Sequence, residues 1–288
     1  MDWSKAKNIL IIAFIITNIF LGLSIFKNMK QYNYFYSVNG QRIKDVISIL
    51  EEKDIIVKTD VPKDVPKLPA LTVKYETYNG NEMAEKFLET YIEKDKEYVK
   101  GNESVKVTFN NKLLIYERKP EIFSLKDISQ EQAKKIADSF IEKYGFSGKN
   151  VEHWSTTKEQ YDEYKIIYKQ KYNDMFLNDS EMKVIVNNTG VVRFERKWLQ
   201  PKVTKMYEKR VIPATKALLM VIDKIKRSVN DEDDKAVITS IRLGYSFEIS
   251  EIDTLANREW HNMESGEVLP YWIICLENNE FIYVEAYE

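Results

Sequence analysis

The stretch MKVIVNNTGVVRFE, residues 182–195, is the strongest indication of the fold class, because an Asn-Asn pair separates two runs rich in β-branched and aromatic residues. Asparagine tolerates the positive φ of tight hairpin turns, and such flanking runs are typical of strands. The stretch therefore predicts a β-hairpin. The same pattern recurs as VKVTFNNKLLIYE at residues 105–117 and as WIICLENNEFIYVE at residues 272–285. We expect three hairpins along the chain.

Each predicted hairpin follows an amphipathic segment with helical spacing of its apolar residues. Within the second of these segments, Ser129 lies three residues before Gln132, as in a capping box, and Gly145 is the expected C-terminal stop. A helix followed by antiparallel strands, repeated along the chain, predicts an α+β fold of helix-plus-antiparallel-sheet units. The three helical segments are residues 82–94, 129–144 and 213–229.

The N-terminal part of the chain differs from the rest in composition. Residues 9–26 (ILIIAFIITNIFLGLSIF) carry no charge and are flanked by lysines on both sides. As a helix, this segment would extend about 27 Å at about 1.5 Å per residue, close to the roughly 30 Å hydrocarbon core of a bilayer. The alternative is a cleaved signal peptide, but its apolar region is usually about 7–15 residues long and ends at a small-residue cleavage site, which is missing here.

We therefore predict a single retained transmembrane helix in the cell membrane. Because only residues 1–8 precede it, we expect the N-terminus to be cytoplasmic and the C-terminal domain extracytoplasmic. Downstream, residues 41–53 have helical spacing, and clustered prolines favour an extended, stiff connector. The predicted divisions are a tail at 1–8, the transmembrane helix at 9–26, a juxtamembrane helix and Pro-rich connector at 27–70, a partial helix-hairpin unit at 71–120, and full α+β units at 121–201 and 202–288.

Composition argues against several function classes. The chain has 43 Lys plus Arg and 45 Asp plus Glu, so no global basic field exists to bind nucleic acid. One Cys and two His leave little material for a metal site, and the acidic run at 230–234 does not match a calcium-binding loop. We interpret His153 and His261 as exposed or structural and Cys275 as a buried thiol. No catalytic residue, metal or cofactor is predicted, and a hydrolase is kept as a lesser alternative.

Polar and small residues inside the apolar segment suggest contacts with other membrane helices. Asn18 lies near its middle, where an amide is costly unless a neighbouring helix supplies a partner. On a helical wheel Ala13, Thr17 and Ser24 form one stripe, while Asn18 and Gly22 form another. Small residues allow close helix approach, so one anchor could contact two partner helices. The alternative for Thr17 and Ser24 is a hydrogen bond to their own backbone four residues back.

Three features together resemble the YycI (WalI) family of low-GC Gram-positive bacteria. They are the opening MDWSKAKNILIIAFIITNIFLGLSIF at residues 1–26, the connector VPKDVPKLPAL at 61–71, and the helix-plus-hairpin repeats. The resemblance covers nearly the whole chain. The opening is its most distinctive part, because the ectodomain pattern is shared by looser relatives such as YycH.

The resemblance implies a non-enzymatic, single-pass membrane regulator of the YycFG (WalRK) two-component system. Proteins similar to this one associate with a YycH-like protein and with the sensor histidine kinase YycG (WalK), and modulate its signalling for cell-wall homeostasis. The resemblance implies no catalytic residue and no cofactor, and it leaves a homo- or hetero-oligomer open. The alternative function is an extracytoplasmic binding module, such as an inhibitor or chaperone of cell-wall enzymes.

Overall fold

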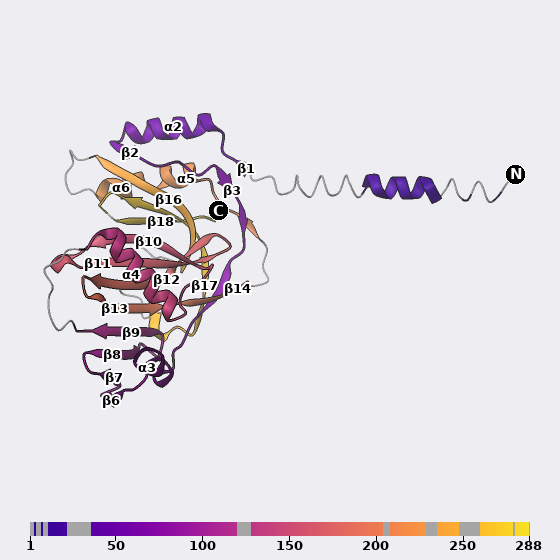
Figure 1. Cartoon of the computed structure of the whole chain (residues 1–288). Coiled ribbons are helices and arrows are strands. Elements are labelled where there is room, and N and C mark those ends of the chain that lie inside the picture. Colours follow the sequence, from indigo (N-terminus) through magenta and orange to yellow (C-terminus); the bar gives the residue numbers. More distant parts are fainter. Residues whose placement is uncertain are drawn as a thin grey trace.

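The computed structural model describes Trp3, Lys7 and residues 11–21, 36–119, 128–203, 208–228, 235–247, 260–278 and 280–287. These residues form a fold with few helices and a large 14-stranded sheet, which agrees with the α+β class that the sequence predicts (Figure 1). The helices are α2 (Gly40–Glu51), α3 (Gly80–Leu88), α4 (Gln130–Lys143), α5 (Ala214–Met220) and α6 (Ile222–Arg227), with short 3-10 turns η1 (Gln160–Asp162) and η2 (Trp260–Asn262).

The sheet follows the order β14-β5-β17-β16-β12-β13-β9-β8-β7-β6, with β10, β11, β18 and β2 attached beside this path. Two further pairs, β1 with β3 and β4 with β15, form small separate sheets. The strands are β1 (Tyr36–Ser37), β2 (Ile55–Val57), β3 (Asp64–Val65), β4 (Lys67–Leu68), β5 (Leu71–Tyr75), β6 (Ile92–Lys94), β7 (Glu97–Lys100), β8 (Glu103–Thr108), β9 (Leu113–Arg118), β10 (Val151–Lys158), β11 (Tyr164–Tyr172), β12 (Met175–Asn187), β13 (Gly190–Lys197), β14 (Leu199–Val203), β15 (Lys209–Arg210), β16 (Ala236–Phe247), β17 (Ser265–Leu276) and β18 (Phe281–Glu285).

The three predicted hairpins are confirmed as β8–β9, β12–β13 and β17–β18. At the first turn Asn110 and Asn111 have positive φ values of 55° and 63°, as the sequence argument requires. At the second turn the positive φ, 113°, belongs to Gly190, and the Asn187 side chain accepts a hydrogen bond from the Thr189 backbone N–H at 2.9 Å. The asparagines of the first turn therefore adopt the positive φ themselves, whereas Asn187 in the second turn acts through its side chain.

Helix α4 agrees with the prediction in detail. Ser129 and Gln132 form a reciprocal capping box, and Gly145 follows the helix with a φ of 67°. The predicted helix at residues 82–94, by contrast, is wrong beyond Leu88. There the Lys100 Nζ donates a hydrogen bond to the Leu88 carbonyl at 2.6 Å, Glu89 turns to a positive φ, and the chain enters β6.

The helix predicted at 213–229 is interrupted at Val221, which separates α5 from α6. Its φ of −114° departs from helical geometry, and its side chain is 3% exposed within the core. Burial of this β-branched residue accompanies the break. The two short helices still present one apolar side to the sheet, through Ala217, Leu218 and Ile225.

The Pro-rich region is extended, as expected, yet it is part of the folded body. Strand β2 pairs in parallel with β16, and β5 lies between β14 and β17. Leu71, Val73 and Tyr75 alternate with more exposed residues along β5, so one face of this strand is buried. Alternation of this kind stabilises a strand within a sheet, and it explains why the segment is more than a link.

The folded body has two halves, each with helices packed on strands (Figure 1). In the α4 half, α3 and α4 cover β8, β9 and β11–β13. In the α5 half, α2, α5 and α6 cover β2 and β16–β18. A third apolar cluster, contributed by β5, β12, β14, β16 and β17, joins them.

The two halves meet where β12 pairs in parallel with β16, Phe176 opposite Gly244 and Leu177 opposite Tyr245. A Cβ at Gly244 would lie 2.8 Å from the Phe176 carbonyl oxygen. Glycine is therefore required for the close approach of the two strands.

Residues 11–21 are helical, and every side chain among them is exposed. Within the described ranges, no helix has both the length and the apolar character needed to cross a bilayer. The predicted transmembrane helix extends over 9–26, of which 9, 10 and 22–26 lie outside the described residues. The membrane-spanning segment therefore stays a prediction.

Candidate binding pocket

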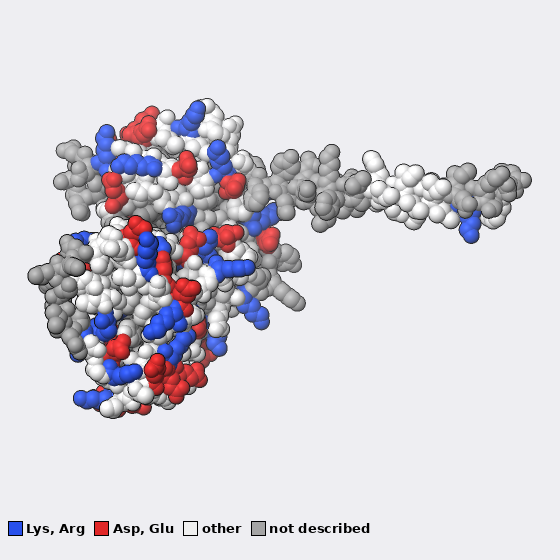
Figure 2. All heavy atoms as spheres, in the orientation of Figure 1, with Lys and Arg blue, Asp and Glu red and all other residues white. Residues whose placement is uncertain are grey.

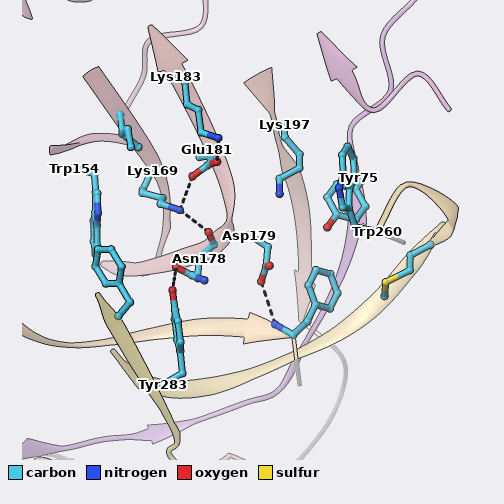
Figure 3. A pocket seen from close by; sticks show the side chains of 14 residues that line it. Tyr75, Trp154, Lys169, Asn178, Asp179, Glu181, Lys183, Lys197, Trp260 and Tyr283 are labelled. Atoms are coloured by element: carbon cyan, nitrogen blue, oxygen red, sulfur yellow. Dashed lines mark hydrogen bonds and ion pairs between the residues drawn. The ribbon is translucent and has the colours of Figure 1, made fainter. Parts of the chain in front are cut away.

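A pocket of about 360 Å³ lies between the two halves of the body (Figure 3). Its volume is at the lower end of the roughly 300–1,000 Å³ of small-molecule sites. Strands from both halves contribute side chains to it. The lining residues are Tyr75, Trp154, Ile167, Lys169, Asn178, Asp179, Glu181, Lys183, Lys197, Phe247, Trp260, Met263, Phe281 and Tyr283.

Aromatic rings form two opposing walls of the pocket. On one side the Tyr75 ring lies 5.4 Å from that of Trp260, centroid to centroid. On the other, Trp154 lies 6.1 Å from Phe281, with Tyr283 beside them (Figure 3). Aromatic rings offer large apolar contact areas and rigid edges, so the walls suit an apolar body placed between them.

A bulge of three residues in β12 supplies two of the polar side chains of the pocket. Lys169 pairs with Glu181, whereas the next residue of β11, Gln170, pairs with Leu177, so residues 178–180 have no partner on β11. Bulges redirect side chains and are frequent beside functional sites. Here the bulge occurs where β12 passes from the α5 half to the α4 half. It turns Asn178 and Asp179 into the pocket (Figure 3).

The bulge residues are anchored by hydrogen bonds. The Ser246 hydroxyl and the Phe247 backbone N–H each donate to Asp179 Oδ2 at 3.2 Å. The Tyr283 hydroxyl donates to Asn178 Oδ1 at 3.3 Å. Asp179 thus connects β12 with β16, and Asn178 connects β12 with β18.

A row of three charged residues crosses the pocket: Lys169 on β11, Glu181 on β12 and Lys197 on β13 are directly opposite one another in register. Lys169 Nζ contacts Glu181 Oε2 at 2.8 Å and also donates to the Asn178 carbonyl at 2.7 Å. Lys183, two residues along β12, contacts Glu181 Oε1 at 3.0 Å. Both carboxylate oxygens of Glu181 therefore have lysine partners other than Lys197.

The surroundings stabilise the charged form of Glu181 and destabilise the charged form of Lys197. Burial opposes ionisation of Glu181, but the charges of Lys169 and Lys183 outweigh it and lower its pKa to about 2. Burial lowers the pKa of Lys197, and the attraction of Glu181 and Asp179 offsets this only in part. Burial also raises the pKa of Tyr283 to about 12. Glu181 is thus held ionised, while the charge on Lys197 lacks full compensation.

The Trp260 wall is positioned by the first hairpin. Lys112 Nζ donates hydrogen bonds to the carbonyl oxygens of His261 and Met263 at 2.6 and 2.8 Å. Asn110 Nδ2 donates to the same His261 carbonyl at 3.0 Å. The β8–β9 turn therefore holds η2, and with it the Trp260 side chain, against the pocket. Sequence reasoning assigned the Asn110 position to the turn but not to this second role.

The residues predicted to contact membrane partners lie far from this pocket in the sequence. Ala13, Thr17 and Asn18 are on the N-terminal helix, whereas Gly22 and Ser24 lie outside the described residues. The Thr17 hydroxyl donates to the Ala13 carbonyl at 2.8 Å. This is the local backbone bond that the sequence offered as an alternative for Thr17. Contacts of these five residues with partner helices stay a prediction.

Neither the two histidines nor the cysteine is among the residues that line the pocket. His153 Nε2 lies 2.8 Å from the Thr156 hydroxyl on β10, and burial lowers the pKa of the ring. Cys275 is partly exposed rather than buried, because Ile274 and Leu276 on either side of it point into the core. Among the described residues no group of His, Cys, Asp and Glu has the arrangement of a metal site; the acidic run at 230–234 lies outside them.

The sequence does not indicate the pocket, because the residues that line it come from seven strands, from η2 and from Met263 just after η2. One local signal was present. Glu181 and Lys183 alternate with the buried Met182 and Val184, so both charges point to the same outward face of β12. The lysines of the neighbouring strands join them only through strand register, and register is not readable from one strand alone.

Comparison with solved structures gives distant similarities. An uncharacterized protein from Eubacterium rectale ATCC 33656 matches with a TM-score of 0.49 and 11% identity over 85% of this chain and 96% of its own. YycH from Bacillus subtilis matches with a TM-score of 0.48 and 10% identity over 76% of this chain and 56% of its own. The Bacillus megaterium YpeB C-terminal domain gives a TM-score of 0.36 and 10% identity, covering 87% and 94%.

Among curated proteins none matches the chain. The family model described as YycI protein, in contrast, matches residues 36–287, which include every strand of the folded body. A match over most of the chain decides membership. The chain belongs to the YycI protein family.

Proposed function

We propose that this chain is a non-enzymatic, membrane-anchored regulator of the YycFG two-component system. In this proposal it binds a YycG-like (WalK-like) sensor histidine kinase together with a YycH-like protein and modulates signalling for cell-wall homeostasis. The single observation that carries the proposal is the family match over residues 36–287. The distinctive opening at residues 1–26 supports it independently, because that segment lies outside the matched region.

The N-terminal helix supports the anchoring part of the proposal. Apolar side chains are exposed along its described length, with Ile12, Phe14 and Phe20 at 56%, 67% and 73%. Exposed apolar area is unfavourable in water at roughly 25 cal/mol per Å², and continuous apolar surfaces mark contacts with a membrane or with protein. A bilayer would cover these side chains. We place the N-terminus in the cytoplasm and residues after 30 outside the cell membrane.

The anchor also offers the means of partner recognition. Asn18 is exposed on the described helix, and an amide in hydrocarbon favours a hydrogen-bonding partner on another helix. Gly22 would lie on the same side one turn later, and Ala13 with Thr17 would form the second stripe. We propose that the Asn18 stripe contacts one membrane partner and the Ala13 stripe another.

The charge distribution of the body is compatible with association through specific contacts. Figure 2 shows basic and acidic side chains interspersed on the visible face of the described body. Interspersed charges of both signs give local complementarity with a protein surface rather than a broad attractive field.

The experiment that tests the proposal is recovery of both partners with the full-length protein from native membranes. Asn18→Leu removes the amide, and Ile12→Leu is the matched control because position 12 lies away from both stripes. We expect Asn18→Leu to reduce recovery of one partner while Ile12→Leu leaves it unchanged. Wild-type protein that recovers neither a YycG-like nor a YycH-like protein would contradict the proposal.

A second candidate function is an extracytoplasmic binding module, and the pocket between the two halves is the observation that favours it. A binding module would act without its anchor. Expression of residues 31–288 as a secreted protein distinguishes the membrane regulator from the binding module. Only a binding module would retain its function without the N-terminal segment. Loss of activity with retained folding would favour the membrane regulator.

A further inference from the structure

The charges in the pocket are unequally paired. Asp179 Oδ2 accepts hydrogen bonds from Ser246 and Phe247, and both oxygens of Glu181 contact lysines. Lys197 differs from the other charged groups. Within the described part of the chain its Nζ has no hydrogen-bond or ion-pair partner, and its closest aromatic contact is Trp260, whose ring centroid lies 5.0 Å away.

The position of Lys197 directs this charge into the pocket. Its side chain extends from the end of β13 towards the space between Glu181, Asp179 and the Trp260 wall, and no dashed line reaches its nitrogen (Figure 3). The same side chain lines a neighbouring pocket of about 170 Å³, which shares Glu181, Lys183 and Trp260. Lys197 therefore lines both hollows.

A partly desolvated ammonium without an anion is unfavourable, and a bound anion would relieve that cost. Burial lowers the pKa of Lys197 because the ammonium is less stable when it is withdrawn from water. A doubly charged group such as phosphate would be repelled by the Glu181 and Asp179 side chains, which line the same pocket. A single carboxylate needs one cation and suffers less repulsion, so it fits this charge pattern better.

The aromatic walls determine what the carboxylate is attached to. Trp260 and Tyr75 lie on one side of the pocket and Trp154 and Phe281 on the other. Apolar pockets with a few placed polar groups bind ligands whose body fills the apolar part while a polar group sets the orientation. The volume of about 360 Å³ admits a small body, such as one aromatic ring or a short alkyl chain.

We propose that this pocket binds a monocarboxylate carried on an aromatic or short aliphatic body, with Lys197 Nζ holding the carboxylate between the aromatic walls. Two sources share this chemistry, the C-terminal carboxylate of a peptide with an apolar last residue and a short free fatty acid. The inference is independent of the kinase partnership, because it rests on pocket residues that do not belong to the anchor.

Isothermal titration of the full-length protein in detergent tests the inference. N-acetyl-L-phenylalanine represents a peptide terminus, hexanoate represents a fatty acid, and N-acetyl-L-phenylalaninamide is the neutral match of the first probe. Lys197→Met removes the charge and keeps an unbranched side chain. Lys135→Met, on the exposed face of α4, is the matched control.

We expect at least one acid to bind wild-type protein and Lys135→Met equally, and to lose roughly tenfold or more in affinity with Lys197→Met. The amide should bind more weakly than its acid by a similar factor. Preference for one acid identifies the source. Equal binding of acid and amide, equal binding to wild-type protein and Lys197→Met, or no binding of either acid at millimolar concentration would overturn the proposal. Thermal unfolding of Lys197→Met, with an unchanged midpoint, excludes misfolding as the cause.

Discussion

The Asp179 carboxylate accepts a hydrogen bond from the Phe247 backbone N–H at 3.2 Å, and it thereby joins the bulge of β12 to the end of β16. The same oxygen accepts the Ser246 hydroxyl. Asp179 is 7% exposed, so these groups are shielded from water. A single buried side chain thus connects the two halves of the body next to the pocket.

Replacing Asp179 by Ala should destabilise the fold. The Ser246 hydroxyl and the Phe247 N–H would lose a buried acceptor, at a cost of about 1–3 kcal/mol for each unsatisfied group. Chemical denaturation followed by tryptophan fluorescence measures the change. Asp60→Ala, at an exposed position, is the control and should change the free energy of unfolding by less than about 0.5 kcal/mol. Equal stability of the two variants would contradict the role of Asp179.

Gly244→Ala should destabilise the junction of β12 and β16. The new Cβ would lie 2.8 Å from the Phe176 carbonyl oxygen and 3.0 Å from Ile273 Cδ1, so the strands must separate. Overpacking of this kind costs about 1–3 kcal/mol. Gly148→Ala is the matched control, because a Cβ there meets open space. The same thermal midpoint for both variants would show that the strands can separate without cost.

The acid stability of the protein should depend on Glu181. Its folded-state pKa of about 2 lies below the ordinary value of 4.5, so its ionisation stabilises the fold above about pH 4.5. That contribution is lost as the pH falls from 4.5 to 2. At about 1.4 kcal/mol per pKa unit it amounts to about 3 kcal/mol at most.

We therefore expect Glu181→Gln to be less stable than the wild type near neutral pH, with a difference that shrinks as the pH approaches 2. Denaturation at a series of pH values measures this difference. Glu142→Gln, on the exposed face of α4, controls for the exchange of carboxylate for amide. If the free energies of unfolding of the wild type and Glu181→Gln differed by the same amount at every pH, the role of Glu181 in acid stability would be contradicted.

Ser129→Ala should weaken the start of α4. The Ser129 hydroxyl accepts a hydrogen bond from the Gln132 N–H at 3.2 Å, and the Gln132 side chain accepts one from the Ser129 N–H at 2.9 Å. Loss of an N-cap side chain costs about 1 kcal/mol. Hydrogen exchange of the first turn of α4 should accelerate with the change in stability. An unchanged exchange rate and an unchanged free energy would show that the cap does not contribute.

The features that the sequence predicts are those encoded within a few neighbouring residues. The capping box of α4 needs Ser129 and Gln132 alone, and the first hairpin needs two asparagines with strand-forming flanks. The end of α3 is different. It depends on Lys100, which lies 12 residues beyond Leu88 and reaches its carbonyl only after β7 has folded back. The helical spacing of apolar residues in this segment does not indicate that contact.

The site depends still more on distant contacts. Lys169, Glu181 and Lys197 are brought into one row by the register of three strands, and Trp260 by a hairpin about 150 residues earlier in the chain. Each residue taken alone reads as a charge or an aromatic on the surface of a strand. The inserted strand β5 is a similar case, because the prolines that precede it indicate extended backbone but do not indicate which strands β5 pairs with.

The decisive measurement is site-specific photo-crosslinking from position 18 of the full-length protein in its native membrane, with position 12, about 120° away around the helix, as the control. We expect a covalent adduct with a YycG-like kinase or a YycH-like protein from position 18, and far less of that adduct from position 12. Equal labelling from both positions, no adduct with either protein, or mature protein that begins after residue 26 would contradict the proposed contact.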